Sequence, residues 1–393
     1  MLRKISKKGT KVLTAVLALL LVFALLSAGC AKRQIAAITP ADNGTISAAN
    51  DVVHEFCSGY KPGDSEELRD FSDMYYPAGI DLTWNYNFAD ASGKADGGKG
   101  EGGEGEGGEG GSGSGPKYAL VYISRTKDLS EAETYVTAGN SVHIDDLLVN
   151  TDYYWQVRAV FEDKTVLSDV FKLHTAHEFR TFAIPSVSNT RDLGGYGVKG
   201  GKKVKQGMIF RGANVDGANS AAKKIMLEEL GIRTDLDLRA PGEGKAGGKF
   251  SPLGEEVNYI NISAPLYGGI KDEDKKEALA EEIRVFTKPE NYPVYFHCAI
   301  GRDRTGTLAM LLLGLLGVPE DMIRRDYEMS FLSYSGSADK TPVETMLSGN
   351  FDPTVNYLKT LSGKSFKDNV ASFLRSIGIT DAELDAIRSI MLE

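Results

Sequence analysis

The segment VYFHCAIGRDRTGTLAM, Val294 to Met310, decides the fold of the second half of the chain. A short apolar run ends at a His-Cys pair, a turn with a glycine follows, and a long apolar segment begins after Thr305. This order is typical of a buried strand, a tight loop and a helix. Cys298 therefore lies between a strand end and a helix start, where the side chain of Arg304 can reach back toward the thiol.

The position of Cys298 indicates its chemistry. Backbone N–H groups point into a loop of this kind, and together with the helix dipole they form an anion site and lower the pKa of a thiol. Arg304 can complete the ring with two parallel hydrogen bonds, a geometry suited to phosphate, and Gly301 lets the loop bend. A thiolate beneath a phosphate cradle predicts phosphoryl transfer through a phosphocysteine. The alternative is a chance neighbourhood of Cys and Arg, which the flanking strand, His297 and the Thr-Gly pair argue against.

Three segments resemble one enzyme family. HCAIGRDRTG, His297 to Gly306, looks like the phosphate loop of the bacterial tyrosine-protein phosphatases, a branch of the cysteine-dependent protein tyrosine phosphatase superfamily. SNTRDLGGY, Ser188 to Tyr196, and GIRTDLDLR, Gly231 to Arg239, fit the same branch. The resemblance covers roughly residues 178–393. It implies hydrolysis, without metal or cofactor, of phosphotyrosine, of phosphoserine or phosphothreonine, or of phosphoinositides.

The resemblance also implies a role for each residue of the loop. Cys298 attacks phosphorus, and Arg304 holds the phosphate oxygens together with the loop N–H groups. Thr305 donates its hydroxyl toward the sulfur and helps to expel it in the second step. His297 orients the loop and tunes the thiolate, or is a purely structural histidine. The other residues expected to bind the phosphate are Ala299, Ile300, Gly301 and Arg302.

The general acid is less well defined by the sequence. The leaving oxygen needs a proton, so a carboxylic acid within reach is expected. Many relatives carry it on a separate loop before the Cys, where this chain has SAPLYGGIKDED, Ser263 to Asp274. We favour Asp303, inside the phosphate loop, over Asp272, which belongs to a charged run typical of a solvated helix start. Another acid, or no dedicated acid, is the remaining alternative, and the competing role of Asp303 is to fix the loop.

Other residues in these motifs have two interpretations each. Arg302 either favours substrates with more than one phosphate or is a solvated side chain. Arg191 and Asp192 either pair with each other or brace the loop. Gly194-Gly195 is more typical of a turn than of a ligand cradle.

GEGKAGGK, Gly242 to Lys249, faintly resembles a nucleotide P-loop. Its first glycine is misplaced relative to Gly248-Lys249, and Phe250 replaces the Ser or Thr that holds magnesium. We therefore predict a flexible surface loop. No cluster of His, Cys and Asp in the sequence indicates a metal site.

The composition excludes other classes of protein. The chain has 393 residues, 42% of them hydrophobic and 25% charged, which leaves room for two domains or slightly more. The formal net charge is -9, and it becomes more negative if the basic leader is removed. Such an acidic chain is a poor candidate for general nucleic-acid binding, so any anion site has to be built locally.

The N-terminal residues are typical of a targeting segment. Basic residues precede an apolar run, Val12 to Leu26, and the sequence LSAGC then ends at Cys30. The run is short for a membrane anchor, which is the alternative. LSAGC resembles the lipobox of bacterial lipoproteins, in which the Cys becomes the lipid-bearing N-terminus. We expect a signal peptide over residues 1–29, a lipid on Cys30, extracytoplasmic anchoring to the bacterial cell membrane, and a spacer over residues 30–50.

Two cysteines remain after the leader, Cys57 and Cys298. They are too few and too far apart for a disulfide framework. We expect Cys57 to be a buried or unremarkable thiol and not a partner of Cys298.

Residues 51–177 are predicted to form a β-sandwich, because several short strands follow one another with turn residues between them. The region resembles a fibronectin type III domain, with Trp84 as its early core Trp and Tyr153 at its tyrosine corner, where Val149 replaces the usual Pro. The acidic, Gly-rich stretch at about residues 90–116 is then an oversized, disordered loop. The predicted strands are residues 80–84, 118–122, 141–148, 153–160 and 170–175.

From about residue 178, strand-like and helical segments alternate, which predicts an α/β fold with a mostly parallel sheet flanked by helices. The predicted strands are residues 208–211, 234–238, 257–262 and 294–297. The predicted helices are residues 221–230, 275–285, 305–316 and 320–331. Thr380 to Glu383 reads as a capping box at the start of a last helix.

Together these features predict a lipid-anchored phosphatase whose sandwich precedes a catalytic domain over residues 178–393. The expected activity is that of a protein tyrosine phosphatase, with dual specificity as an option, acting on phosphorylated proteins. One alternative is a phosphoinositide or inositol polyphosphate phosphatase, and another is a non-catalytic surface protein that captures phosphorylated ligands. The partner of the sandwich is left open. The cations available to line a polyphosphate site are Arg302, Lys245, Lys249 and Lys271.

Overall fold

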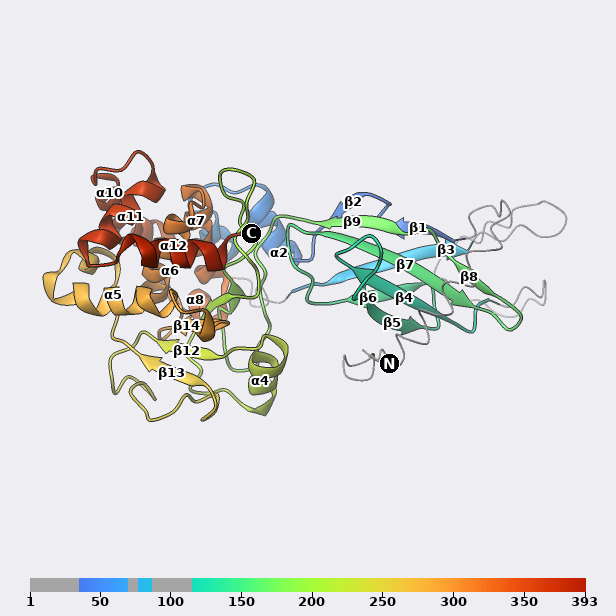
Figure 1. Ribbon diagram of the computed structural model, residues 1–393, viewed down its shortest axis with the longest axis horizontal. Helices are drawn as coiled ribbons and strands as arrows, with labels where there is room; N and C mark the ends of the chain where they lie inside the picture. The colour runs from blue at the N-terminus through green and yellow to red at the C-terminus, as the bar shows by residue number, and fades with distance from the viewer. Residues whose placement is uncertain (1–34, 70–76, 87–114) are drawn as a thin grey trace. The chain divides into compact units, whose positions relative to one another are not determined.

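A computed structural model describes residues 35–69, 77–86 and 115–393 (Figure 1). The predicted signal peptide, Cys30 and nearly all of the predicted Gly-rich loop lie outside these residues. The chain divides into two compact units. The first consists of residues up to Ala48, Gly79–Leu147 and Thr151–Ala176, and the second of Ala49–Ala78, Leu148–Asn150 and His177–Glu393. In the described part of the chain, no helix is both long and apolar enough to cross a membrane.

The first unit consists of two β-sheets. Its strands are β1 (Ile35–Thr39), β2 (Gly44–Ile46), β3 (Ile80–Tyr86), β4 (Tyr118–Ser124), β5 (Glu133–Thr137), β6 (Ser141–Ile144), β7 (Asp152–Val160), β8 (Thr165–Leu167) and β9 (Phe171–Thr175). One sheet has the order β1-β3-β6, and the other has the order β2-β9-β7-β4-β5 with β8 paired to β7. Neighbouring strands are antiparallel except β2 and β9, which are parallel.

Alternation along the strands decides which face of each sheet is buried. In β7 the side chains of Tyr153, Trp155, Val157 and Ala159 are buried, whereas the residues between them are partly exposed, as a period of two requires. Trp155 meets Trp84 of β3 with ring centroids 6.5 Å apart, so the two sheets share this core. The predicted strands are present, although β6 ends well before residue 148. The fibronectin type III assignment stays a prediction.

The ends of the first unit differ from the prediction. Part of the predicted spacer forms β1 and β2, because these short strands pair with β3 and β9. The residues that follow leave the unit, since helices α2 (Asp51–Ser58) and α3 (Ser65–Leu68) belong to the second unit. α2 has one apolar face, and its Val53 and Phe56 join the main core of the second unit. That burial explains why this segment folds there and not as sandwich strands.

The second unit is built around one five-stranded sheet. Its strands are β10 (Arg191–Asp192), β11 (Ile209–Gly212), β12 (Thr234–Asp237), β13 (Asn258–Asn261) and β14 (Val294–His297). The order is β10-β11-β14-β12-β13, and all pairs are parallel except β10 with β11. The predicted, mostly parallel sheet is therefore confirmed. Because β14 lies between β11 and β12, the loops after these three strands meet at one edge, where ligands bind in folds of this class.

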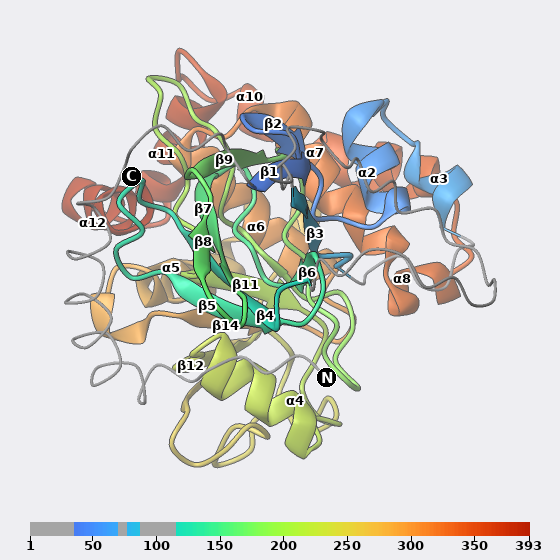
Figure 2. The same cartoon turned by 90° about the vertical axis from the view of Figure 1, so that its right-hand side faces the viewer.

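Helices cover both faces of this sheet (Figures 1 and 2). They are α4 (Ser220–Lys224), α5 (Lys276–Val285), α6 (Asp303–Leu316), α7 (Glu320–Glu328), α8 (Tyr334–Ala338), α9 (Val343–Met346), α10 (Asp352–Lys359), α11 (Phe366–Ser376) and α12 (Asp381–Met391). α4 lies on one face, and α5, α6 and α11 lie on the other. β14 serves both layers, because Val294 and Phe296 pack into the core with α6 whereas Tyr295 packs into the core with α4.

The four predicted helices are present with shifted ends. The one expected at residues 221–230 is α4 continued by a π-helical turn, Ile225–Glu229, and the one expected at 320–331 is α7 followed by a 3-10 turn, Met329–Leu332. α6 begins at Asp303, earlier than predicted, so both Asp303 and Arg304 belong to its first turn. The predicted capping box is confirmed at the start of α12.

Candidate active site

The residues after β14 form the predicted strand–loop–helix unit. Cys298 directly follows β14, and α6 begins at Asp303. Gly301 has a φ of 75°, and a Cβ at this position would lie 2.3 Å from the carbonyl of Gly212 at the end of β11. Only glycine fits both this conformation and this approach.

Three successive carbonyl groups of the loop each accept a hydrogen bond from a scaffold side chain. The bonds run from Asn214 Nδ2 to the Ala299 oxygen at 2.8 Å, from Asn189 Nδ2 to the Ile300 oxygen at 2.9 Å, and from Arg211 Nη2 to the Gly301 oxygen at 2.7 Å. In a trans peptide the N–H points opposite to the C=O. Fixing these carbonyls toward the scaffold therefore turns the N–H groups toward the interior of the loop, where an anion would bind.

Cys298 is almost fully buried, with 2% of its surface exposed. Burial is the largest effect and by itself raises a thiol pKa. This effect of burial is opposed by the hydroxyl and N–H of Thr305, the charge of Arg304 and the N–H of Gly301. Together they lower the pKa of Cys298 below its ordinary value. The Thr305 hydroxyl is buried and bonds to no nitrogen or oxygen of the described residues, so it is available to the sulfur. Cys57 is also a free thiol, but burial raises its pKa to about 12.

His297 is fully buried beside the thiol. Its Nε2 lies 2.9 Å from Asp235 Oδ1, and its Nδ1 lies 3.1 Å from the carbonyl oxygen of Cys298. Both ring nitrogens thus face acceptors, which a protonated imidazole satisfies. Burial lowers the pKa of His297, but Asp235 and Asp237 outweigh burial and raise it. The His297 ring therefore ties the backbone of Cys298 to the buried Asp235.

Arg304 is paired with an acid to which no sequence pattern pointed. Its Nη1 and Nη2 bind Glu243 Oε1 and Oε2 at 2.8 and 2.9 Å. These two bonds use the Nη1–Nη2 edge of the guanidinium. The edge that contains Nε presents a second pair of N–H donors with a similar geometry. The hydrogen bond from Arg304 lowers the pKa of Glu243, so the acid is ionised. Glu243 lies in the predicted surface loop, where an isolated acid among glycines carries no signal of this contact.

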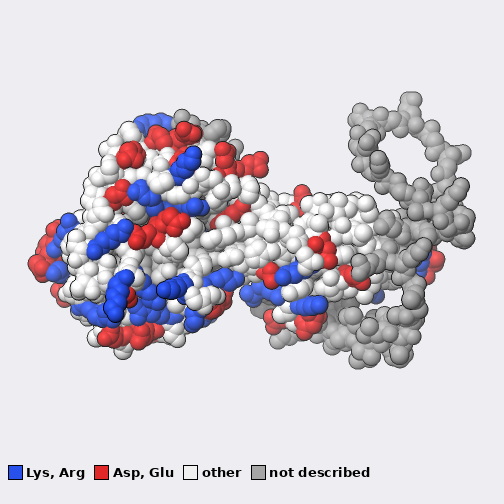
Figure 3. Space-filling view, turned by 90° about the horizontal axis from the view of Figure 1, so that it is seen from above, with Lys and Arg blue, Asp and Glu red and all other residues white. Residues whose placement is uncertain are grey.

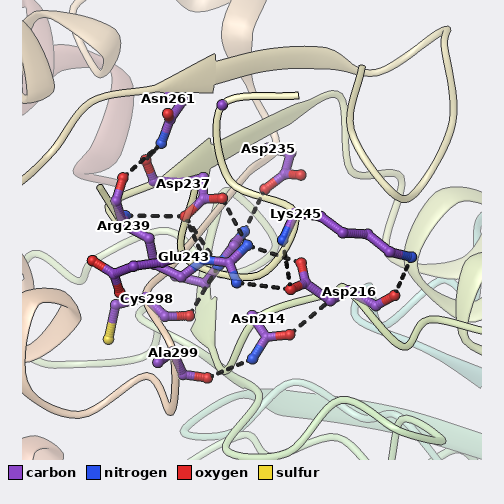
Figure 4. A network of polar contacts seen from close by, with 12 residues as sticks. Asn214, Asp216, Asp235, Asp237, Arg239, Glu243, Lys245, Asn261, Cys298 and Ala299 are labelled. Carbon is purple, nitrogen blue, oxygen red and sulfur yellow. Dashed lines mark hydrogen bonds and ion pairs between the residues drawn. The ribbon is translucent and has the colours of Figure 1, made fainter. Parts of the chain in front are cut away.

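The loop that carries Glu243 is tied to the site by a charged network beside Cys298 (Figure 4). Arg239 binds the two oxygens of Asp216 at 2.8 and 2.9 Å. Lys245 donates from Nζ to the Asp216 carbonyl at 2.6 Å and from its backbone N–H to the Asp216 carboxylate at 3.0 Å. The stretch that resembled a P-loop is thus an anchored part of the site.

Asp303 lies in the first turn of α6. Its Oδ1 accepts hydrogen bonds from the Tyr267 hydroxyl and from Arg302 Nε, the latter at 3.0 Å. Asp272, the predicted alternative, is exposed at the start of the turn Glu273–Lys275. The segment in which many relatives carry the acid therefore contributes a tyrosine hydroxyl to Asp303.

Arg302 differs from both interpretations of its sequence position. It is buried, with 5% of its surface exposed, and so is neither solvated nor a free cation at the mouth. Its Nη1 binds Asp339 at 2.7 Å, its Nε binds Asp303, and its guanidinium lies 5.0 Å from the ring centre of Phe331. Two carboxylates and an aromatic face already occupy this cation, which therefore does not provide a second phosphate site.

Arg191 and Asp192 take separate partners. Arg191 Nε binds Asp326 at 2.8 Å, and Arg191 Nη1 binds Asn189 Oδ1 at 2.6 Å. Asp192 binds Arg180 at 3.1 Å. Since Asn189 holds a loop carbonyl, the bracing interpretation describes Arg191.

Asp326 of α7 is the buried centre of this brace. It binds Arg191 and Arg211, and Arg211 also holds the carbonyl of Gly301. Burial would raise the pKa of Asp326, but the two guanidinium groups outweigh burial and lower it. Asp326 lies 135 and 115 positions from these partners in the chain. No local pattern could have identified it.

Comparisons with known proteins agree with the geometry. A sequence profile of the tyrosine phosphatase family matches residues 182–393. A Cupriavidus necator protein, provisionally named a tyrosine-protein phosphatase, is 32% identical over 37% of this chain and 61% of its own length. A Nostoc commune tyrosine-protein phosphatase is 31% identical over 28% of this chain and 44% of its own length. The match thus spans less than two thirds of either relative.

The core catalytic domain of the PP-IP phosphatase SIW14 from S. cerevisiae aligns with 39% of this chain and 86% of that domain, at 14% identity and a TM-score of 0.26. A likeness of this size carries no weight for fold or function.

Proposed function

The chain belongs to the tyrosine phosphatase family, and on that premise we propose that it is a protein tyrosine phosphatase with Cys298 as its nucleophile. Family membership makes the chain a cysteine-dependent phosphatase, and phosphotyrosine in proteins is the substrate we assign to it. One observation carries the assignment. The buried thiol of Cys298 has a lowered pKa and lies in a loop whose N–H groups turn inward, and the first turn of α6 places Arg304 beside this loop.

In the first step the thiolate of Cys298 attacks phosphorus, so that an S–P bond forms while the ester P–O bond breaks. Arg304, through its Nε edge, and the loop N–H groups hold the three phosphoryl oxygens. Asp303 transfers its proton to the leaving oxygen. The products are a phosphocysteine, the free alcohol or phenol, and an ionised Asp303.

In the second step a water molecule attacks the phosphocysteine. The water gives its proton to Asp303, the S–P bond breaks, and the Thr305 hydroxyl donates a hydrogen bond to the departing sulfur. Phosphate leaves and the thiolate is restored. The cycle therefore balances with water as the only co-reactant.

The charge around the site supports a substrate with a single phosphate. Glu243 places a negative charge beside Arg304, and Arg302 is paired with Asp339 within the protein. The lysines proposed to line a polyphosphate site have contacts of their own: Lys245 with the Asp216 carbonyl, Lys249 over the Phe250 ring and Lys271 over the Tyr357 ring. On the face seen in Figure 3, basic and acidic side chains are interspersed over this unit. A densely anionic inositol polyphosphate needs a more uniformly basic surface.

The test is phosphate release by the chain that starts after Cys30, with EDTA present. Its substrates are phosphotyrosine and phosphoserine peptides, phosphoinositides and inositol hexakisphosphate, each repeated with Cys298→Ser. We expect release from the phosphotyrosine peptide by the wild type alone. Preference for a phosphoinositide or inositol hexakisphosphate would replace the protein substrate. No release from any of them, by a folded wild type that binds phosphopeptide, would favour a non-catalytic binding protein.

For the first unit we propose a fibronectin type III module that acts as a spacer or binds a partner. The support is the pair of sheets with strand order β1-β3-β6 and β2-β9-β7-β4-β5 around Trp84 and Trp155. Alanine substitutions of exposed residues of the first unit should leave phosphatase activity on small aryl phosphates unchanged. A loss of that activity in a folded variant would contradict a spacer role.

For the N-terminus we propose lipid attachment at Cys30 and extracytoplasmic anchoring, on the strength of the LSAGC sequence. Mass spectrometry of the mature protein is expected to find a diacylglycerol-modified Cys30 as the first residue. Cys30→Ala should abolish the lipid modification and keep the leader uncleaved. An unmodified Cys30 in membrane-bound protein would contradict this proposal.

A further inference from the structure

Tyr267 is held against the start of α6 in an unusual conformation. It has a φ of 48°, a region that a bulky L-residue rarely occupies and that often accompanies function. Its backbone N–H donates to Thr307 Oγ1 at 2.9 Å, and this hydroxyl donates to the Asp303 carbonyl at 3.0 Å. The side chain is buried, and its ring meets Tyr327 edge-on with centroids 6.1 Å apart. Backbone and side chain thus both fix Tyr267 beside Asp303.

The hydroxyl groups of the two tyrosines form a directed chain. Tyr267 donates its single proton to Asp303 Oδ1. The hydroxyl oxygen of Tyr327 lies 2.6 Å from that of Tyr267. Because the Tyr267 proton is already used, Tyr327 is the donor in this second bond. Tyr327 therefore orients Tyr267, and Tyr267 orients Asp303.

The two oxygens of Asp303 have unequal surroundings. Oδ1 accepts from the Tyr267 hydroxyl and from Arg302 Nε at 3.0 Å. Among the residues that the structure describes, Oδ2 has only a long contact with Arg302 Nη2 at 3.4 Å. A proton on Oδ1 would have to displace one of two donors, whereas Oδ2 can carry it without losing a good hydrogen bond.

We propose that Tyr267 is the positioning residue of the general acid. By holding Oδ1, it makes Oδ2 of Asp303 the atom that gives its proton to the leaving oxygen as the P–O bond breaks, and that receives a proton from water in the second step. This inference rests on the proposed function, and in particular on Asp303 as the acid.

The test compares aryl phosphates whose leaving groups differ in basicity. Tyr267→Phe keeps the ring and removes only the hydroxyl. We expect kcat for phenyl phosphate to fall about tenfold, part of the gain that a general acid supplies, with little change in KM. For 2,4-dinitrophenyl phosphate, whose leaving group departs without a proton, we expect less than about a twofold change. Tyr327→Phe should act in the same direction and less strongly.

Tyr292→Phe is the matched control. Tyr292 is a buried tyrosine of the same unit, and its hydroxyl donates to the Phe286 carbonyl at 2.7 Å. Its loss removes a buried hydrogen bond of similar kind away from Asp303. We expect a comparable loss of stability without any dependence on the leaving group. If Tyr267→Phe does not fold, Tyr327→Phe measured against Tyr292→Phe decides the inference.

Asp303→Asn separates the possible failures. If the wild type hydrolyses none of the aryl phosphates, the proposed function fails. If Asp303→Asn shows no dependence on the leaving group while the wild type is active, the acid assignment fails and the role of Tyr267 fails with it. If Asp303→Asn shows the dependence and Tyr267→Phe behaves like Tyr292→Phe, only the present inference is overturned.

Discussion

Two glycine-containing loops leave neighbouring parallel strands at the same edge of the catalytic sheet. The phosphate loop, Cys298–Arg302, follows β14, and the Glu243 loop, Ala240–Phe250, follows β12. Fully buried charges centred on Asp326 brace the first loop. The second loop is held by acids that water still reaches, since 22% of the Asp216 side chain and 42% of the Glu243 side chain are exposed. The phosphate loop is thus braced more firmly than the Glu243 loop.

The comparison predicts its largest difference between two basic residues, Arg304 after the phosphate loop and Lys245 in the Glu243 loop. Arg304→Lys should lower kcat/KM on a phosphotyrosine peptide about 10²–10³-fold, because an ammonium group cannot form a two-bond fork to phosphate. Lys245→Met should lower it less than about threefold, because Lys245 is exposed and binds only Asp216, which anchors its own loop. Similar losses in both variants would remove the distinction between the loops.

The fully buried Asp326 and the partly exposed Asp216 should differ in what they contribute to stability. Asp326→Asn should lower the free energy of unfolding by about 3–5 kcal/mol, since it leaves two buried guanidinium groups without their carboxylate. Asp216→Asn should cost about 1 kcal/mol or less, because Arg239 keeps Asp237 as a partner. Urea unfolding at pH 7 measures both.

The pH dependence of the Asp326 effect has a defined sign. Because its folded-state pKa is lowered from the ordinary value of 3.8, its stabilisation is full above that value and is lost as the pH falls below it. The difference between wild type and Asp326→Asn should therefore shrink in acid. A difference that grows in acid would contradict the assignment of an ionised Asp326.

The two free cysteines should react at very different rates. At pH 7 iodoacetate should modify Cys298 and leave Cys57 untouched, because the pKa of Cys298 is lowered whereas that of Cys57 is raised to about 12. The rate at Cys298 should fall as the pH drops through its lowered pKa. Thr305→Ala, which removes the foremost stabilising hydrogen bond, should move this curve to higher pH. Peptide mapping distinguishes the sites, and equal labelling of the folded protein would contradict the pKa directions.

A modest effect on phosphate affinity is expected for Glu243 itself. Glu243→Gln should tighten inhibition by inorganic phosphate about threefold to tenfold, because the carboxylate of Glu243 beside Arg304 no longer repels the anion. Glu229→Gln, an exposed acid on the α4 side of the sheet, is the matched control and should leave the inhibition constant unchanged. Weaker phosphate inhibition in Glu243→Gln would instead show that Glu243 mainly orients the guanidinium.

The parts that the sequence predicted are those in which the informative residues are contiguous. The strand, Cys298, Gly301 and Arg304 lie within one short segment, so their spacing already indicates a loop between β14 and α6. The alternation in β7 predicts its buried face for the same reason. Local periodicity and local spacing contain this information.

The parts that it did not predict depend on contacts between distant positions. Glu243 reaches Arg304 across 61 positions, and Tyr267 reaches Asp303 across 36. Arg302 looked like a mouth cation because its partner Asp339 lies 37 positions further on. Side chains of these types occur throughout the sequence, and only the fold selects the pairs.

The second unit is interrupted in the chain, because α2 and α3 lie between two segments of the first unit, and the sheet of the second unit follows the last segment. The early helices supply donors to a buried acid, since Tyr60 and Ser65 bind Glu328 at 2.7 and 2.9 Å. A protein truncated at residue 178 would leave this carboxylate without those donors, which is costly for a buried group. During synthesis α2 and α3 emerge after β1 and β2 but before the rest of the first unit, so they are made well before the surface on which they dock. The practical N-terminal limit of the catalytic unit is therefore near Ala49, and the intact chain has to close a large loop in order to complete it.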